Sequence, residues 1–246
     1  MSEILVLCYH AVSERWKADL AVTPEALRRQ VELLLGRGYV PATFGAAVAA
    51  APGPKTLAIT FDDAFRSVFE LAFPLLSELG APATVFVPTQ HVDSGQPMAW
   101  PGIDQWLGGP HEQELVGMSW KDVATLAGAG WEIGSHTRTH PRLTQLDDAE
   151  LARELAGSRH DCEAQLAIPC LSLAYPYGDV DARVAAAAAG AGYHAAAELS
   201  RRLRGGRALR WPRVGVYNAD GELRFRLKTG RALRRVRALG SVVPGR

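Results

Sequence analysis

Short apolar runs alternate with amphipathic stretches along most of the chain. The apolar runs predict buried strands, and apolar positions spaced three and four residues apart predict helices. The strand candidates are residues 4–9, 56–60, 83–87, 131–135 and 171–175, with weaker ones at 193–197 and 213–216. Strands and helices that alternate this often are typical of a parallel sheet or barrel. We therefore predict an α/β domain whose chemistry lies at the carboxyl ends of the strands.

Helix start signals lie between the strand candidates. Thr23 and Pro24 are typical of an N-cap and a first helical position, and an apolar stripe follows them. Ser119 and Asp122 have the spacing of a capping box. Further helices are expected over residues 65–76, 147–166 and 180–189, the first of them kinked or divided at Pro74.

Two regions fall outside the alternation. Residues 90–118 are rich in glycine and proline and carry Trp100 and Trp106, so we predict a long loop inserted into a barrel domain of residues 1–220. Residues 221–246 form a basic tail. Its charged residues are Arg224, Arg226, Lys228, Arg231, Arg234, Arg235, Arg237 and Arg246, against Glu222.

The basic tail has two interpretations. In a helix, Ala232, Val236 and Leu239 would form an apolar line beside the arginines. Such an amphipathic segment fits peripheral contact with an anionic membrane. A solvated helix packed on the barrel is the alternative, because runs of charge are usually solvated faces.

Composition and charge narrow the class of protein. Of the 246 residues, 48% are hydrophobic and 22% charged, the balance of a globular protein that needs no disulfides to fold. The net charge of +1 argues against nucleic acid as a partner. No apolar run reaches the length of about 18 residues that predicts a membrane-spanning helix.

The cysteines and the first residues bear on location. Cys8, Cys162 and Cys170 lack a CxxC spacing, and the N-terminus does not resemble a secretory signal. We therefore expect a cytoplasmic protein with reduced thiols, peripheral at the inner membrane face if the tail binds lipid. A secreted protein whose leader has been removed is the alternative.

Polar side chains follow three of the strand candidates. They are Asp62 and Asp63, then His136 and His140, and finally the run Tyr175-Pro176-Tyr177-Gly178. Adjacent carboxylates at the end of a buried strand repel each other and lose hydration unless a cation or hydrogen bonds compensate. A divalent cation could be bound by one carboxylate while the other stays free as a base. Helix caps or polar turns are the alternatives for both motifs.

The two histidines have the His-x3-His spacing of imidazoles that bind one metal ion. His136 and His140 precede Pro141 and lack the glutamate of the HExxH motif, which argues against a zincin protease. One carboxylate and two imidazoles leave positions open for water and substrate, as in catalytic metal sites. Zinc is the expected ion, with cobalt, nickel or iron as alternatives.

Together these motifs resemble a known family. Thr60-Phe61-Asp62-Asp63 and His136-Thr137-Arg138-Thr139-His140 resemble the first two signature motifs of the polysaccharide deacetylases, the NodB-homology group of carbohydrate esterase family 4. Tyr175-Pro176-Tyr177-Gly178 looks like the end of the third motif. The resemblance spans residues 4–218 and implies a distorted (β/α)7 barrel. It also implies Asp63, His136 and His140 as metal ligands and Asp62 as the general base.

The chain departs from the family pattern at two places. Ala174 stands where many members have an arginine that orients the base, and no late Leu-x-His motif supplies a general acid. The run Leu7-Cys8-Tyr9-His10 instead resembles the branch that includes exopolysaccharide poly-N-acetylglucosamine deacetylases. That branch implies His10 as the acid, and a histidine of the core is the alternative.

The remaining candidates concern substrate and transition state. The resemblance implies that the backbone N–H of Tyr177, beside Pro176, holds the oxyanion. We hypothesise that Arg213 replaces the missing arginine and reaches the base, with a surface salt bridge as the alternative. Trp100 and Trp106 are candidates for stacking on sugar rings or for anchoring the inserted loop.

These motifs predict a metal-dependent deacetylase that hydrolyses the N-acetyl group of an acetamido sugar in a polysaccharide or lipid-linked glycan precursor. Hydrolysis of another amide or imide on the same scaffold is one alternative. A carbohydrate-binding module without catalysis is the other, against which the complete set of Asp62, Asp63, His136 and His140 argues. The sequence does not determine the sugar, the choice between N- and O-acetyl groups, or the oligomeric state.

Overall fold

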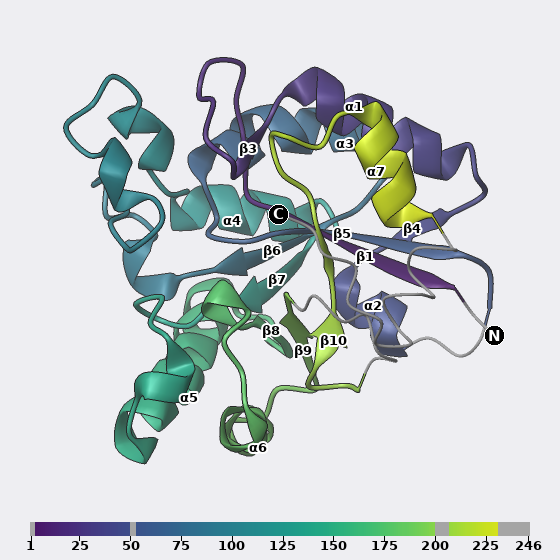
Figure 1. Cartoon of the computed structure of the whole chain (residues 1–246). Coiled ribbons are helices and arrows are strands. Elements are labelled where there is room, and N and C mark those ends of the chain that lie inside the picture. The colour runs from purple at the N-terminus through teal and green to yellow at the C-terminus, as the bar shows by residue number, and fades with distance from the viewer. Residues whose placement is uncertain (1–2, 50–52, 200–206, 231–246) are drawn as a thin grey trace.

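A parallel sheet that curves into a barrel organises the chain. The computed structural model describes residues 3–49, 53–199 and 207–230 (Figure 1). Nine strands of the described chain form one sheet in the order β10-β9-β8-β7-β6-β5-β1-β11, with β4 paired to β5. Each of these pairings is parallel. The parallel α/β architecture predicted from the alternating pattern is confirmed.

The elements follow one another in regular order. The strands are β1 (Ile4–Tyr9), β4 (Val40–Ala42), β5 (Thr56–Phe61), β6 (Thr84–Val87), β7 (Glu132–Ser135), β8 (Ser172–Ala174), β9 (Ala195–Glu198), β10 (Trp211–Pro212) and β11 (Val214–Gly215), with a separate pair β2 (Ala11–Val12) and β3 (Ala21–Val22). The helices are α1 (Pro24–Leu35), α2 (Phe44–Ala49), α3 (Phe73–Glu78), α4 (Trp120–Gly128), α5 (Asp148–Leu166), α6 (Ala182–Gly190) and α7 (Glu222–Thr229). In Figure 1, α1, α3 and α7 cover one side of the sheet, and α5 and α6 cover the opposite side.

One short segment brings the two edges of the sheet together. Trp211 pairs with Ala197 of β9, and three residues later Val214 pairs with Leu7 of β1. Arg213 lies between these two pairings, so residues 211–215 link the last strand of the series to the first. The distorted, nearly closed barrel that the resemblance implied is confirmed.

Successive side chains of each strand point to opposite faces of the sheet, so they pack in two different clusters. Leu7 of β1 and Ile59 of β5 point outward into the large cluster under the helices. Val6 and Ala58, one residue earlier on each strand, belong to a second cluster that includes Phe44 of α2. This second cluster fills the barrel interior beside α2. The next inward positions toward the carboxyl ends are polar, and they lead into the candidate site.

The predicted helix signals act as expected. The Thr23 hydroxyl accepts a hydrogen bond from the backbone N–H of Ala26, and Ser119 and Asp122 form a reciprocal capping box. A π-helical turn at Val68–Ala72 precedes α3, whose second residue is Pro74. The helix is not divided at Pro74, since the backbone is helical from residue 66 to residue 78. The π-helical turn instead lies directly before the proline, which has no N–H to donate.

The segment predicted as an inserted loop contains short 3₁₀ turns at Thr89–His91, Asp104–Trp106 and Glu112–Leu115. It returns to the barrel through an isolated bridge between Phe65 and Gly117. In Figure 1 it lies at the end toward which the arrows of β6 and β7 point.

The described part of the basic tail is mostly α7. Phe225 is buried in the main core, whereas Leu223 and Leu227 are exposed. The predicted apolar line of Ala232, Val236 and Leu239 lies outside the described residues. Across residues 3–49, 53–199 and 207–230, no helix combines the length and the apolar character that crossing a bilayer requires.

Candidate active site

Residues far apart in the sequence gather at the carboxyl ends of the strands. Asp62 and Asp63 directly follow β5, His10 follows β1, His136 follows β7, Tyr177 follows β8, and Arg213 lies between β10 and β11. The carboxyl ends of parallel strands meet at one edge, which is where ligands bind in barrels of this kind.

Asp63, His136 and His140 form a compact buried group. The Oδ1 atom of Asp63 lies 3.3 Å from Nε2 of His136 and 3.3 Å from Nε2 of His140. All three residues are buried, and their ligand atoms lie within 4.8 Å of one another. The two imidazoles and the carboxylate therefore converge on one point, as the motif spacing predicted.

The hydrogen bonds around Asp63 and His136 leave lone pairs free to bind a cation. Nδ1 of His136 lies 2.8 Å from the carbonyl oxygen of Ala174, which can only accept, so this nitrogen carries the proton. In the neutral ring, Nε2 then presents a lone pair toward Asp63. Oδ1 of Asp63 is buried and accepts no hydrogen bond from a described residue. A divalent ion would satisfy these facing acceptors, and one carboxylate with two imidazoles suits such an ion.

The backbone at these motifs adopts an unusual conformation. Among the described residues, the non-glycine residues with positive φ in the site motifs are Asp63 (70°), Ala64 (49°), Thr137 (67°), His140 (61°) and Tyr177 (60°). Left-handed backbone is costly for residues with a β-carbon and clusters at functional sites. The turns after β5, β7 and β8 therefore place their side chains at a conformational cost that the surrounding structure must offset.

Arg213 reaches Asp62 inside the barrel. Nη1 donates to Oδ1 at 2.6 Å and Nη2 donates to Oδ2 at 2.7 Å, while Nη1 also donates to the Thr60 hydroxyl at 3.0 Å. Arg213 is 1% exposed and Asp62 is 4% exposed. Burial raises the pKa of Asp62, but the charge and hydrogen bonds of Arg213, together with the charges of His136 and His10, outweigh it and lower the pKa to about 2. Asp62 is therefore ionised at neutral pH.

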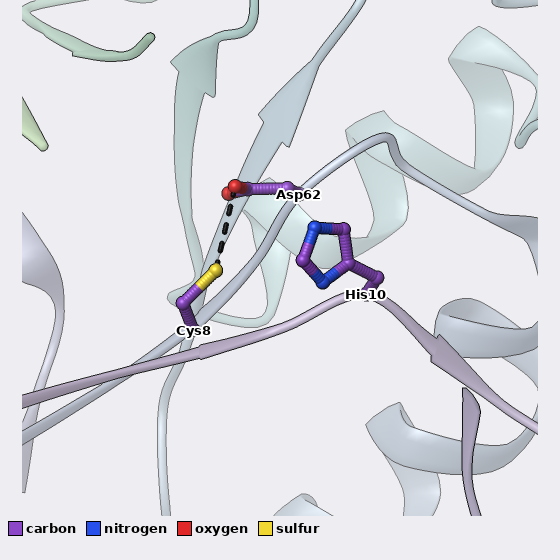
Figure 2. A group of neighbouring side chains, drawn as sticks. All are labelled: Cys8, His10 and Asp62. Carbon is purple, nitrogen blue, oxygen red and sulfur yellow. Dashed lines mark hydrogen bonds between the residues drawn. The ribbon is translucent and has the colours of Figure 1, made fainter. Parts of the chain in front are cut away.

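Cys8 and His10 lie beside the same carboxylate (Figure 2). The Cys8 thiol donates to Oδ2 of Asp62 at 3.4 Å, and burial raises its pKa well above the usual value, so it remains a neutral donor. Burial lowers the pKa of His10, although Asp63 and Asp62 oppose that shift. Nδ1 of His10 has no hydrogen-bond partner among the described residues.

Cys8, His10 and Asp62 also have ligand atoms within 4.8 Å of one another. Both oxygens of Asp62 already accept hydrogen bonds from Arg213, however, and its positive charge repels a second cation. Of these two groups, Asp63, His136 and His140 are therefore the candidate metal site.

Aromatic residues surround His140. The indole of Trp100 stacks on the imidazole with a centroid distance of 4.1 Å, and the ring of Tyr177 meets it edge-on at 4.7 Å. Trp100 is 6% exposed, so its indole is covered by protein and packs on His140, a candidate metal ligand, rather than facing solvent. Trp106 packs edge-on against Trp16 at 5.8 Å.

Beyond these rings, the Arg142 guanidinium lies over the ring of Tyr177, 4.2 Å from its centroid. Pro176, next to Tyr177, is buried.

The polysaccharide deacetylase family model matches residues 49–196 of the chain. The chain belongs to the polysaccharide deacetylase family. The matched range contains Asp62, Asp63, His136 and His140, and it leaves out His10 and Arg213. A curated relative, YxkH of Bacillus subtilis, is named as a candidate polysaccharide deacetylase and is 25% identical over 197 residues. That similarity covers 78% of this chain and 63% of the relative, so the chain spans less than two thirds of it.

Several solved structures share the fold. The Streptococcus pyogenes deacetylase PplD in complex with acetate has a TM-score of 0.75 and 20% identity, covering 92% of this chain and 98% of its own. IcaB from Ammonifex degensii has a TM-score of 0.73 and 21% identity, covering 95% and 98%. A de-N-acetylase from Aggregatibacter actinomycetemcomitans has a TM-score of 0.76 and 16% identity, covering 92% and 99%.

Some contacts of the site were not predicted from the sequence. Cys8 was predicted as a reduced thiol and, like Thr60, named only as part of a motif, yet both contact the Asp62–Arg213 pair. The alternation of side chains between the two faces of a strand could have identified them, because Cys8 and Thr60 are paired residues on the inward faces of β1 and β5. The Ala174 carbonyl could not be found this way, since backbone acceptors leave no trace in residue type.

Proposed function

We propose that this chain is a metal-dependent deacetylase that hydrolyses the N-acetyl group of an acetamido sugar in a polysaccharide or a lipid-linked glycan precursor. The observation that carries the proposal is the convergence of Asp63, His136 and His140 beside an ionised carboxylate, Asp62, in a chain of the polysaccharide deacetylase family. The solved structure described as a de-N-acetylase supports the choice of an amide rather than an ester.

Asp63, His136 and His140 would hold the ion, and zinc is the ion we propose for one carboxylate and two imidazoles. A divalent ion bound there would supply a Lewis acid that could polarise the acetyl carbonyl and lower the pKa of water from 15.7 to about 7.

Asp62 would accept the proton of the attacking water. Its ionised state at neutral pH is the state that a base requires. A pKa of about 2 also makes it a weak base, so its contribution depends on position more than on proton affinity. Arg213 supplies that position, since its two nitrogens hold both carboxylate oxygens in one orientation.

His10 would protonate the departing amine, which leaves poorly as an anion. A lowered pKa makes its imidazolium a stronger acid, at the cost of a smaller protonated fraction at neutral pH. The backbone N–H of Tyr177 would donate to the developing oxyanion, and the left-handed turn at this residue sets the direction of that group.

The test is mass spectrometry of N-acetylglucosamine oligosaccharides incubated with the zinc-loaded protein. We expect the wild type to release acetyl groups, and Asp62→Asn to keep its zinc and lose about 10²–10⁴-fold in rate. Asp148→Asn is the matched control, because Asp148 lies on the surface of α5 and pairs with Arg183. Full activity in Asp62→Asn would refute the assignment of the base. Bound zinc and glycan affinity without hydrolysis of any acetamide would instead favour a binding module.

A further inference from the structure

The loop that carries both imidazoles belongs to neither a strand nor a helix. It runs from the end of β7 to His140, and Thr137 and His140 within it have positive φ. Its geometry therefore depends on contacts with neighbouring elements. Conformational freedom in this loop would let Nε2 of His136 and Nε2 of His140 move apart, although both must bind the same ion.

One face of α5 packs against this loop. The residues on that face are Glu154, Gly157, Ser158 and Asp161, spaced three and four apart as on one side of a helix. The Ser158 hydroxyl lies 2.8 Å from that of Ser135, which in turn accepts from the backbone N–H of Thr137 at 3.0 Å. A β-carbon on Gly157 would lie 2.7 Å from Cδ of Arg138, so the glycine leaves room for that side chain to cross the helix in its present position.

Glu154 makes the densest contact with the loop. Its Oε2 atom accepts hydrogen bonds from the backbone N–H of Arg138 at 2.8 Å and of Thr139 at 3.0 Å. Its Oε1 atom accepts from the Thr139 hydroxyl at 2.7 Å. One carboxylate thus binds two consecutive backbone N–H groups between the two candidate ligands.

Asp161 lies about two turns further along α5 than Glu154 and contacts the same loop. Its Oδ2 atom accepts from Nε of Arg138 at 3.0 Å and from the Thr89 hydroxyl at 2.7 Å. The backbone N–H of Thr89 donates to the carbonyl of Thr137 at 3.0 Å. The loop is therefore held between α5 and the segment that follows β6.

We propose that Glu154 is a positioning residue of the metal site, which fixes the His136–His140 loop in its ion-binding conformation before the ion arrives. The proposal rests on the proposed function, because it assumes that these imidazoles bind an ion. Removing the carboxylate leaves two backbone N–H groups without their acceptor, and the loop must then be ordered at the expense of binding free energy. Outer partners of this kind typically change metal affinity by about 10–100-fold.

The experiment measures zinc affinity by competition with a chromophoric chelator, together with thermal unfolding of the metal-free proteins. Glu154→Ala should bind zinc about 10–100-fold more weakly than the wild type, and Glu154→Gln should fall between them because its amide oxygen can still accept. Glu163→Gln is the matched control. Glu163 is a partly exposed residue of the same helix that pairs with Arg159 and does not contact the loop in any described interaction.

The outcomes separate the two proposals. No zinc binding by the wild type would refute the metal site itself. Tight binding by the wild type with equal affinity in Glu154→Ala would overturn only the positioning role, as would a lowered unfolding temperature without any loss of affinity. If Glu154→Ala does not fold, Thr139→Val decides, since it removes the single bond to Oε1. Unchanged affinity in both Thr139→Val and Glu154→Gln would then overturn the proposal.

Discussion

Replacing Arg213 by methionine tests the buried ion pair at the centre of the site. Methionine keeps an unbranched side chain in the barrel but removes the charge and the three hydrogen bonds to Asp62 and Thr60. Asp62 would then be a buried carboxylate without its counter-charge, so burial would raise its pKa. Removing one partner of a buried ion pair typically costs about 3–5 kcal/mol.

The assay is thermal unfolding of the metal-free protein at pH 7, so that lost metal binding does not contribute. In a chain of this size, the expected cost corresponds to a fall of about 6–20 °C in the unfolding temperature. Arg210→Met is the matched control. Arg210 pairs with Glu198 and is 41% exposed in its side chain, so its replacement should cost about 1 kcal/mol or less.

A double-variant cycle makes the reasoning refutable. Asp62→Asn removes the charge that Arg213 compensates, so Arg213→Met should cost much less in that background. Equal costs of Arg213→Met in both backgrounds would show that the two side chains do not interact energetically. A cost below about 1 kcal/mol in the wild-type background would contradict the destabilisation expected for a buried pair.

Further predictions concern the acid, the stacked indole, the pH response and the tail. His10→Gln should lower kcat by about 10²–10⁴-fold while zinc content stays at the wild-type level, and an unchanged kcat would exclude His10 as the acid. Trp100→Ala should weaken zinc binding about 10-fold or more by freeing His140, and wild-type affinity would show that the stacking is irrelevant to the site. The pKa of Asp62 is lowered from 3.8 to about 2, so its ionised form stabilises the metal-free protein above pH 3.8 and this contribution is lost as the pH falls toward 2. Acid unfolding of Asp62→Asn should lack that component, and superimposable curves would contradict it. Truncation after Gly230, which spares α7, should abolish binding to anionic vesicles at low salt, and a lack of binding by the intact chain would refute the membrane proposal.

The strands could be predicted because buried strands consist largely of apolar residues, which stand out in the sequence. The candidate at residues 4–9 coincides with β1, and the candidate at 56–60 ends one residue before β5 does. The helix α2 and the pair β2 and β3 were not predicted. The strands of that pair have two residues each and α2 has six, which is too short for a periodic pattern to stand out.

The site was predictable where its residues are adjacent in the sequence. Asp62 and Asp63 form one motif, and His136 and His140 share one loop. The partner of Asp62 is 151 positions away, so the sequence could only suggest Arg213 from the absence of an arginine elsewhere. Glu154 was not predicted, because a polar face on a long helix also fits exposure to solvent.

The central claim is that Asp63, His136 and His140 bind one divalent ion, and metal analysis tests it most directly. Zinc would be counted per chain by plasma mass spectrometry after loading and exhaustive dialysis, in the wild type and in His140→Ala. We predict one zinc ion per chain in the wild type and its loss in His140→Ala. A wild type without bound metal, or a variant that retains the full amount, would contradict the account.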